Sequence, residues 1–193
     1  MTLNLFIIGP SGCGKSTQAK LIAQKYNLTH LSMGQLLRDE ISNSSPLGIE
    51  AKGYIDQGKW VPDELAFRVL TTKLESINNS NFIIDGFPRM LNQGELIEQY
   101  LASKNQSFSL LILLSVTFEE IMARRTRLGQ SFQDASRTDN SAEAVASRQK
   151  SYNDTISPII GHYEQSGKMV VVDGNRTVEP VFADIVTEIE KVK

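Results

Sequence analysis

The sequence predicts an α/β fold in which a five-stranded parallel sheet lies between two layers of helices. Five short apolar runs recur along the chain, separated by longer amphipathic stretches, at residues 3–8, 30–31, 82–84, 110–114 and 169–172. Because these runs are continuously apolar rather than alternating, they are typical of parallel strands that are covered on both faces. Strand–helix alternation of this kind predicts a doubly wound, three-layer arrangement.

Helical periodicity marks the stretches between the predicted strands. A helix over residues 17–26 follows the first strand, and apolar residues recur at helical spacing over residues 66–77 and again over 182–192. After the fourth strand, Thr117 is followed three residues later by Glu120, which is the pattern of a capping box. We therefore expect a helix to begin at this point.

Composition limits the class of protein. The chain has 193 residues, with 20 Lys and Arg against 22 Asp and Glu and a net charge of −2. This balance argues against a non-specific nucleic-acid binder, which needs a basic excess. A single cysteine, Cys13, excludes a disulfide framework and a cysteine-rich zinc site and fits a reducing compartment. The first apolar run is too short for a signal peptide or a membrane span, so we expect a cytoplasmic protein.

Two stretches interrupt the alternation of strands and helices. Residues 32–61 are helical in pattern but contain no strand, and residues 129–141 are polar and rich in turn formers. Long polar loops in compact domains often act as lids. We expect one domain whose core comprises residues 1–31, 62–126 and 141–193, with two inserts at 32–61 and 127–140.

A phosphate-binding loop follows the first predicted strand. Residues 9–16 read Gly-Pro-Ser-Gly-Cys-Gly-Lys-Ser and satisfy the pattern G-x-x-x-x-G-K-[ST] between a strand and a helix. The glycines allow backbone N–H groups to surround phosphate oxygens, and the helix N-terminus adds its positive dipole end. Lys15 supplies a point charge, Ser16 a hydroxyl for Mg²⁺, and Cys13 acts as a spacer. The alternative is a glycine-rich turn that binds nothing, which the strand and helix context disfavours.

Asp85 closes the apolar run at residues 82–84. An aspartate at the carboxyl end of a parallel strand lies at the edge of the sheet where ligands bind. It can hold Mg²⁺ directly or through water, as phosphate-loop enzymes require. The alternative is a loop aspartate that caps the following turn.

Several arginines fall outside the loop, and their planar guanidinium groups are suited to binding phosphate oxygens in pairs. Any one of them, taken alone, is better explained as part of a solvated helix face. The set comprises Arg38, Arg89, Arg124, Arg125, Arg127, Arg137 and Arg148.

Four segments together carry a specific resemblance. They are residues 9–18 (GPSGCGKSTQ), 30–40 (HLSMGQLLRDE), 82–93 (FIIDGFPRMLNQ) and 137–148 (RTDNSAEAVASR). In motif and spacing the chain resembles the nucleoside monophosphate kinases, and most closely those adenylate kinases that have a short lid. The resemblance implies a single nucleotide kinase domain over residues 1–193, in which 32–61 is a mobile acceptor-binding segment and 127–140 is the lid.

The resemblance also implies roles for individual residues. The ATP-binding set is Gly12, Cys13, Gly14, Lys15, Ser16, Thr17, Arg124, Arg137 and Gly174. The AMP-binding set is Met33, Arg38, Lys59, Val61, Gly86, Arg89, Gln93, Arg137 and Arg148. The catalytic set is Lys15, Arg89, Arg124, Arg137 and Arg148, and Ser16 and Asp85 are the metal-binding pair.

Within these sets, Arg38 and Arg89 match residues that grip the acceptor phosphate, and Gln93 matches the side chain that reads the edge of the acceptor adenine. Arg124 matches an arginine that packs on the donor base. Arg137 and Arg148 match arginines that bridge both phosphate groups as the lid closes.

The chain departs from the family pattern at three positions. Ser16 stands where most adenylate kinases have glycine, Met33 where threonine is usual, and Leu128 where the family has an arginine. We expect Arg127, offset by one residue, to assume part of the missing arginine's role.

The function that this reading predicts is reversible transfer of a phosphoryl group from ATP to AMP, with Mg²⁺ as cofactor. Nucleotides are then the only partners, without nucleic acid or membrane, and the enzyme is a monomer. A UMP/CMP-type kinase is the alternative, which Met33 permits, and Ser16 alone suggests a small-metabolite kinase. A non-catalytic nucleotide-binding module is also an alternative, against which the arginine set argues. His30 and His162 are expected to be structural.

Overall fold

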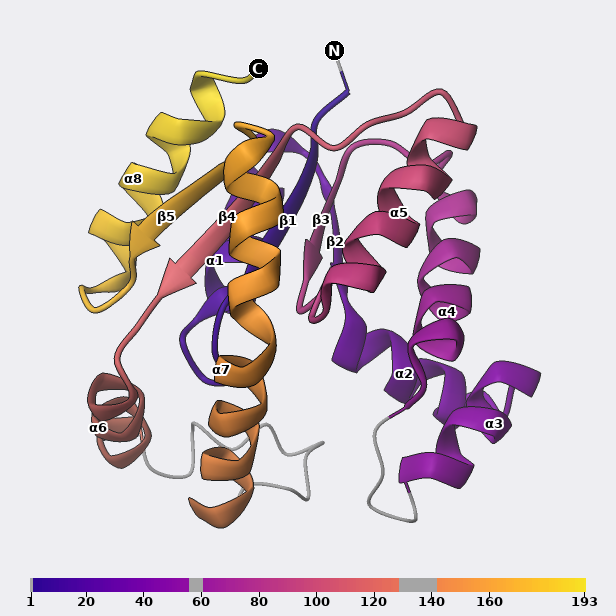
Figure 1. Ribbon diagram of the computed structural model, residues 1–193, viewed down its shortest axis with the longest axis horizontal. Helices are drawn as coiled ribbons and strands as arrows, with labels where there is room; N and C mark the ends of the chain where they lie inside the picture. The colour runs from indigo at the N-terminus through magenta and orange to yellow at the C-terminus, as the bar shows by residue number, and fades with distance from the viewer. Residues whose placement is uncertain (1, 56–60, 129–141) are drawn as a thin grey trace.

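The structure is a computed structural model that describes residues 2–55, 61–128 and 142–193 (Figure 1). Its strands are β1 (Asn4–Ile8), β2 (Thr29–Ser32), β3 (Phe82–Asp85), β4 (Leu110–Ser115) and β5 (Met169–Asp173). Its helices are α1 (Lys15–Tyr26), α2 (Met33–Ser42), α3 (Pro46–Ile55), α4 (Asp63–Ser76), α5 (Leu91–Ser103), α6 (Phe118–Leu128), α7 (Ala142–Gln165) and α8 (Val178–Glu190).

The five strands form one parallel sheet in the order β2-β3-β1-β4-β5, which confirms the predicted fold class. β1 lies at the centre, between β3 and β4. Because all strands run the same way, their carboxyl ends meet at one edge, toward which the arrowheads point in Figure 1. Ligands of doubly wound sheets bind at this edge, where the strand order reverses.

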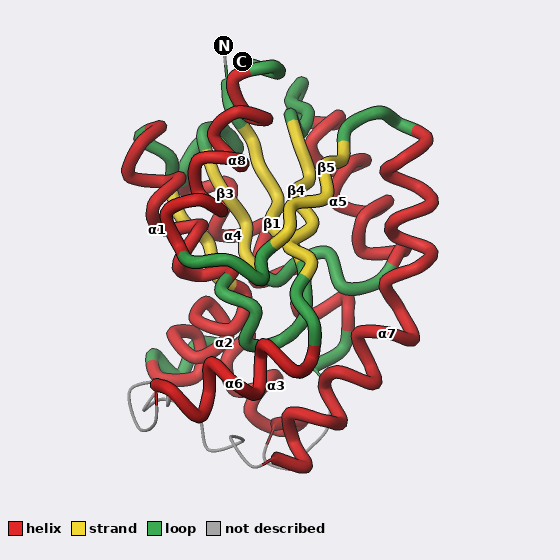
Figure 2. Tube along the Cα trace, turned by 90° about the vertical axis from the view of Figure 1, so that its left-hand side faces the viewer, coloured by secondary structure: helices red, strands yellow, loops and turns green. Residues whose placement is uncertain are grey.

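Side chains alternate between the two faces of β1, and each face has its own core. Phe6 and Ile8 belong to a buried cluster with residues of α4, α5 and α7. Leu5 and Ile7 belong to a second buried cluster with residues of α1, α6 and α8. Figure 2 shows the sheet between these layers, with α1 and α8 on one side and α5 and α7 on the other. Two covered faces explain why the inner strands β1, β3 and β4 are almost entirely apolar and buried.

The start of α6 fulfils only half of the predicted capping box. The backbone N–H of Glu120 donates to Thr117 Oγ1 at 3.3 Å, as expected. The Glu120 carboxylate does not complete the box: it accepts from Arg124 Nε at 2.8 Å. The Thr117 N–H instead donates to Asn175 Oδ1, at 3.0 Å, in the loop between β5 and α8.

The predicted insert at 32–61 is helical over its described part up to residue 55, as its pattern predicts. Within residues 33–55 the structure places α2 and α3 and no strand. The two helices cross closely at Gly48, where an added Cβ would lie 2.0 Å from the carbonyl oxygen of Glu40. This contact fixes α3 against α2.

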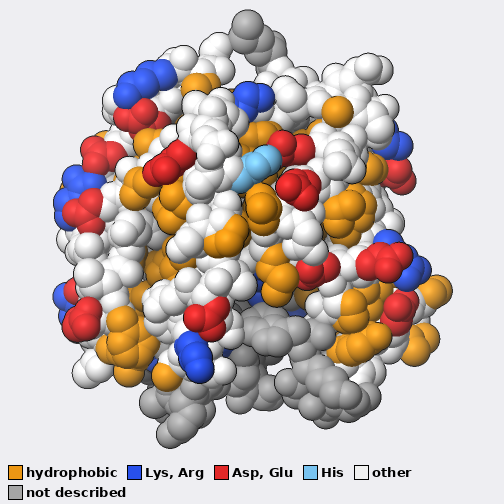
Figure 3. Space-filling view, in the orientation of Figure 1, with side chains coloured by type: hydrophobic (Ala, Val, Ile, Leu, Met, Phe, Trp, Pro, Cys, Tyr) orange, Lys and Arg blue, Asp and Glu red, His pale blue; other side chains and the backbone are white. Residues whose placement is uncertain are grey.

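One face of the molecule can be compared with the near-neutral composition. Acidic and basic side chains intermingle over the face drawn in Figure 3, with apolar side chains scattered between them. In the described part of the chain, no helix is both long and apolar enough to cross a membrane.

We expect Gly48→Ala to lower the free energy of unfolding by about 1–3 kcal/mol, because its methyl group would collide with backbone and force α2 and α3 apart. Gly53→Ala in the same helix is the matched control: nothing lies within 4 Å of its Cβ, and alanine favours helix by about 1 kcal/mol. Urea unfolding of both variants measures the difference. Equal effects of the two changes would contradict the close crossing.

Candidate nucleotide site

The loop between β1 and α1 has the backbone of a phosphate cradle. Gly14, the N-cap of α1, has a φ of 100°, and Gly9 has a φ of 149° with no room for a Cβ, which would lie 2.5 Å from Leu114 O. Glycine is required at both places. The loop therefore brings backbone N–H groups and the N-terminus of α1 to the carboxyl edge of the sheet.

Lys15 is held against this loop. Its Nζ donates to the carbonyl oxygens of Gly9 at 2.9 Å and Pro10 at 2.7 Å. Cys13 is buried beneath it, with Sγ 3.7 Å from Lys15 Nζ. The ammonium group thus lies where a phosphate bound by the loop would meet it, and the buried position of Cys13 fits a spacer.

Asp85 and Ser16 meet at the end of β3. The Ser16 hydroxyl donates to Asp85 Oδ2, and the carboxylate is buried. Burial raises the pKa of Asp85, but the His30 imidazole, the Lys15 ammonium and the Ser16 hydroxyl outweigh it and lower the pKa below its usual range. The site therefore presents an ionised carboxylate and a hydroxyl side by side.

His30 is a neighbour of this site that the sequence did not reveal. Its Nε2 lies 3.8 Å from Asp85 Oδ2. The contact arises because β2 pairs with β3 in a register that places Ser32 beside Asp85. The expectation of a structural histidine rested on the absence of a base role in phosphoryl transfer. Its proximity to Asp85 follows from the strand order.

Arg124, which lies on α6, joins this helix to the phosphate loop and to the loop after β5. Its guanidinium donates to Cys13 O at 3.1 Å, to Gly174 O and to Arg176 O at 3.1 Å. Its Nε donates to Glu120. These bonds use the edges of the planar group, so its faces are what a base can stack on.

Glu120 holds two arginines at once. Arg124 and Arg127 both donate to Glu120 Oε1, the latter at 2.6 Å. The hydrogen bond from Arg124, opposed by partial desolvation and reinforced by Arg127, lowers the pKa of Glu120. Arg127 is therefore engaged on α6, and whether it also replaces the family arginine at Leu128 stays a prediction.

Arg148 reaches the loop from α7. Its NH1 lies 3.4 Å from Ser11 Oγ, so a residue far along the chain adds a cation beside the phosphate cradle. Gly174, between β5 and α8, fits only as glycine, since a Cβ would lie 2.6 Å from Val116 Cγ2. Gly174 is linked to the loop through Arg124, whose guanidinium donates to both Gly174 O and Cys13 O, and the roles of Arg148 and Gly174 stay predictions.

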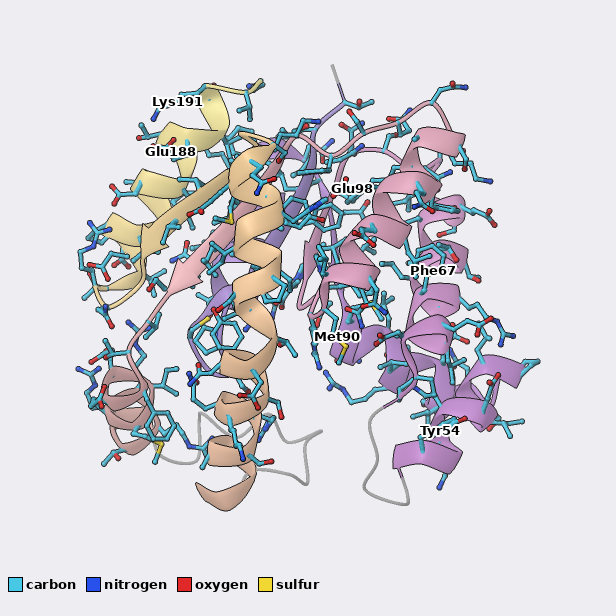
Figure 4. All side chains as sticks on the ribbon, in the orientation of Figure 1. Tyr54, Phe67, Met90, Glu98, Glu188 and Lys191 are labelled. Atoms are coloured by element: carbon cyan, nitrogen blue, oxygen red, sulfur yellow. The ribbon has the colours of Figure 1, made fainter. Side chains whose placement is uncertain are left out.

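On the other side of Asp85, the chain turns into α5 through the segment that carries Arg89. Its Nε donates to Gly86 O at 2.9 Å, and the Gly86 N–H donates to Ile7 O at 3.3 Å. Gly86 has a φ of 82°, which glycine tolerates. Met90, labelled in Figure 4, marks the start of α5 next to Arg89.

The remaining acceptor candidates lie on α2 and before α4. Arg38 NH2 donates to Gln35 Oε1 at 2.7 Å on the same helix. Met33 is buried, 3 % exposed, and packs in the core cluster rather than on the surface, while Val61 packs against that cluster from outside. Lys59 and Arg137 lie outside the described residues, as does most of the predicted lid.

Gln93 is the buried polar residue of this segment, 5 % exposed. Its Oε1 accepts from the Arg89 N–H at 2.7 Å, and its Nε2 donates to Asp63 Oδ1 at 2.6 Å. Asp63 is the first residue of α4, and nothing in the sequence pattern singled it out.

A phosphate cradle, an ionised carboxylate beside a hydroxyl, and arginines from several elements meet at the carboxyl edge of a parallel sheet. This fold and site define a phosphate-loop kinase. A family model for adenylate kinase matches residues 7–168. The chain is also similar to the adenylate kinase of Phocaeicola vulgatus, 39% identical over 191 residues that cover 98% of this chain and 100% of the relative.

Two further relatives extend the similarity. The adenylate kinase of Bacteroides thetaiotaomicron is 38% identical, covering 98% of this chain and 100% of its own. That of Prochlorococcus marinus is 36% identical, covering 96% and 97%. The chain belongs to the adenylate kinase family and is a phosphotransferase. A pyrimidine monophosphate kinase is not favoured.

Arg124→Lys tests the donor side. A lysine keeps the charge but cannot bond the three carbonyl groups at once, so we expect KM for ATP to rise about tenfold, the worth of one charged hydrogen bond. Steady-state kinetics with each substrate varied separately measures it. Arg68→Lys, at an exposed ion pair with Glu50, is the control and should change neither KM. An unchanged KM for ATP in Arg124→Lys would show that the carbonyl bridge does not position the nucleotide.

Proposed function

We propose that the chain transfers the γ-phosphoryl group of ATP reversibly to AMP, giving two ADP, at the carboxyl edge of β1 and β3. One observation carries this: the two strands are direct neighbours, with Ile7 opposite Asp85. The phosphate loop leaves β1 and the segment with Arg89 and Gln93 leaves β3. The segment proposed to bind ATP and the segment proposed to bind AMP therefore leave the sheet from adjacent strands.

On the donor side, the loop holds the triphosphate through its backbone and Lys15. The residues assigned to ATP are Gly12, Cys13, Gly14, Lys15, Ser16, Thr17, Arg124, Arg137 and Gly174. The geometry of Arg124 supports its part, because its edges are bonded to carbonyl groups while its plane is suited to stacking on a base.

On the acceptor side, Arg38 and Arg89 bind the phosphate of AMP and Gln93 reads its base. The residues assigned to AMP are Met33, Arg38, Lys59, Val61, Gly86, Arg89, Gln93, Arg137 and Arg148. The buried amide of Gln93, four residues after Arg89, supports this division between phosphate and base.

Mg²⁺ fits the pair formed by Ser16 and Asp85. Both offer hard oxygen atoms, and the lowered pKa of Asp85 keeps its carboxylate ionised. Among the described residues, no group of three or more His, Cys, Asp or Glu is placed to hold a metal ion. A pair suits Mg²⁺, which commonly binds one or two protein oxygens together with water and substrate phosphates. When bound, the ion would neutralise charge on the phosphates.

Catalysis then rests on positioning and charge neutralisation rather than on a general base. Lys15 donates to a carbonyl group of its own loop, and Arg148 reaches Ser11 of that loop from α7. The catalytic set is Lys15, Arg89, Arg124, Arg137 and Arg148. Closure of the acceptor-binding segment, 32–61, and the lid, 127–140, over the core excludes water and prevents hydrolysis of ATP.

The enzyme in this proposal works as a cytoplasmic monomer whose partners are nucleotides. The family resemblance and the lone, buried Cys13 support it. Sedimentation with and without nucleotide measures the oligomeric state, and a dimer would contradict this part.

Lys15→Met should lower kcat on the order of 100-fold or more, because removal of one charged contact at the transferring phosphate costs transition-state stabilisation. Lys20→Met, an exposed position in the same helix, is the control and should retain activity. A coupled ADP-production assay measures both. Substantial activity in Lys15→Met would refute the phosphate-loop mechanism.

The acceptor is tested with a panel of AMP, GMP, CMP and UMP, each with ATP and Mg²⁺. We expect kcat/KM for AMP to lead by about tenfold or more, since a mismatched base leaves buried polar groups unpaired. Gln93→Ala should reduce that lead, whereas Gln99→Ala, exposed on the same helix, should not. A kcat/KM for CMP or UMP equal to that for AMP would contradict AMP as the acceptor.

A further inference from the structure

The amide of Gln93 is held at both of its ends. The Arg89 N–H donates to Oε1 at 2.7 Å, and Nε2 donates to Asp63 Oδ1 at 2.6 Å. The other oxygen of Asp63 accepts from Asn92 Nδ2 at 3.0 Å. One carboxylate thus joins the first residue of α4 to two neighbouring side chains at the start of α5.

These partners permit only one orientation of the amide. A backbone N–H can only donate, and a carboxylate oxygen can only accept. If the amide rotated by 180°, its NH₂ would face the Arg89 N–H and its oxygen would face the Asp63 carboxylate. Both contacts would then be repulsive inside a buried site, where unpaired polar groups are costly.

A fixed amide gives the acceptor site a fixed polarity. A glutamine amide has two N–H donors and an oxygen with two lone pairs. Arg89 and Asp63 use one position at each end, which leaves one donor and one acceptor of known order for a base. Adenine offers an amino donor beside a ring-nitrogen acceptor. Guanine offers the reverse, an oxygen acceptor beside a ring N–H donor, and would be matched only by the rotated amide.

We propose that Asp63 is a positioning residue for base selection: it prevents rotation of the Gln93 amide and so makes the site favour 6-aminopurine monophosphates over 6-oxopurine ones. The inference rests on the proposed function, in which Gln93 contacts the base. Of the two groups that hold the amide, only the Asp63 carboxylate can be removed by a substitution, because the other is the backbone N–H of Arg89.

The test is Asp63→Asn, whose side-chain amide can satisfy either orientation of Gln93. We expect the ratio of kcat/KM for AMP over GMP to fall by roughly tenfold, as one of the two repulsive contacts disappears. We expect KM for AMP to rise and kcat to stay unchanged. Glu64→Gln removes an exposed charge at the next position and Asn92→Ala removes the other partner of Asp63, and both should keep the ratio.

A second measurement tests whether the Gln93 amide is held in place when no nucleotide is bound. In nitrogen-15 NMR spectra of the ligand-free protein, we expect slow solvent exchange of the Gln93 side-chain amide, about tenfold or more slower than that of the exposed Gln99. This protection should be reduced in Asp63→Asn, where the amide can rotate and its NH₂ group lacks an acceptor in one of the two orientations. Fast exchange in the unmodified protein would overturn the proposal even if the variant failed to fold.

The outcomes separate this inference from the function beneath it. If Gln93→Ala reduces the preference for AMP while Asp63→Asn leaves the ratio unchanged, the positioning role is wrong and the proposed function stands. If Gln93→Ala leaves the preference unchanged, the base contact itself is wrong, and the role of Asp63 in selection falls with it. In the double variant, Asp63→Asn should add no further loss to that of Gln93→Ala.

Discussion

The parallel pairing of β1 with β3 is the constraint on which the site depends. It places Ile7 opposite Asp85 and lets the Gly86 N–H bond to Ile7 O at 3.3 Å. The phosphate loop and the chain that leads to α5 therefore leave the sheet from adjacent strands. A hydrogen bond between Ser16 and Asp85 closes the gap between them. Any shift of this register would separate the carboxylate from the loop.

Hydrogen bonds from Arg124 to backbone carbonyl groups also hold the site together. Arg124 holds Cys13 O, Gly174 O and Arg176 O, so α6, the phosphate loop and the loop after β5 are fixed relative to one another. Glu120, whose carboxylate would complete a capping box, holds Arg124 instead. The glutamate of the predicted capping box therefore holds an arginine that bonds to segments distant in the sequence. These charged hydrogen bonds add directional contacts to the apolar cluster that α1, α6 and α8 share.

What the sequence could predict is what depends on short segments. Apolar runs located β1, β3, β4 and β5, a two-residue segment at 30–31 located β2, and the spacing of Gly14, Lys15 and Ser16 located the loop, since periodicity and motif are local properties. The pairing of His30 with Asp85 needed the strand order, and that of Asp63 with Gln93 needed the packing of α4 beside α5. Neither is encoded in a motif. The sequence therefore predicted the candidate phosphate-binding groups but not the residues that contact them through the fold.

Base selection illustrates the difference between a residue's identity and its surroundings. Met33 departs from the family pattern, yet its side chain is 3 % exposed and packs in the core cluster, where a thioether fills space and carries no directional hydrogen bond. Gln93 matches the family, but a glutamine by itself accepts either order of donor and acceptor, because its amide can rotate. Selectivity requires that rotation be blocked. In the proposed site, Met33 is therefore a poorer guide to the acceptor than Asp63 at the start of α4, which no motif contains.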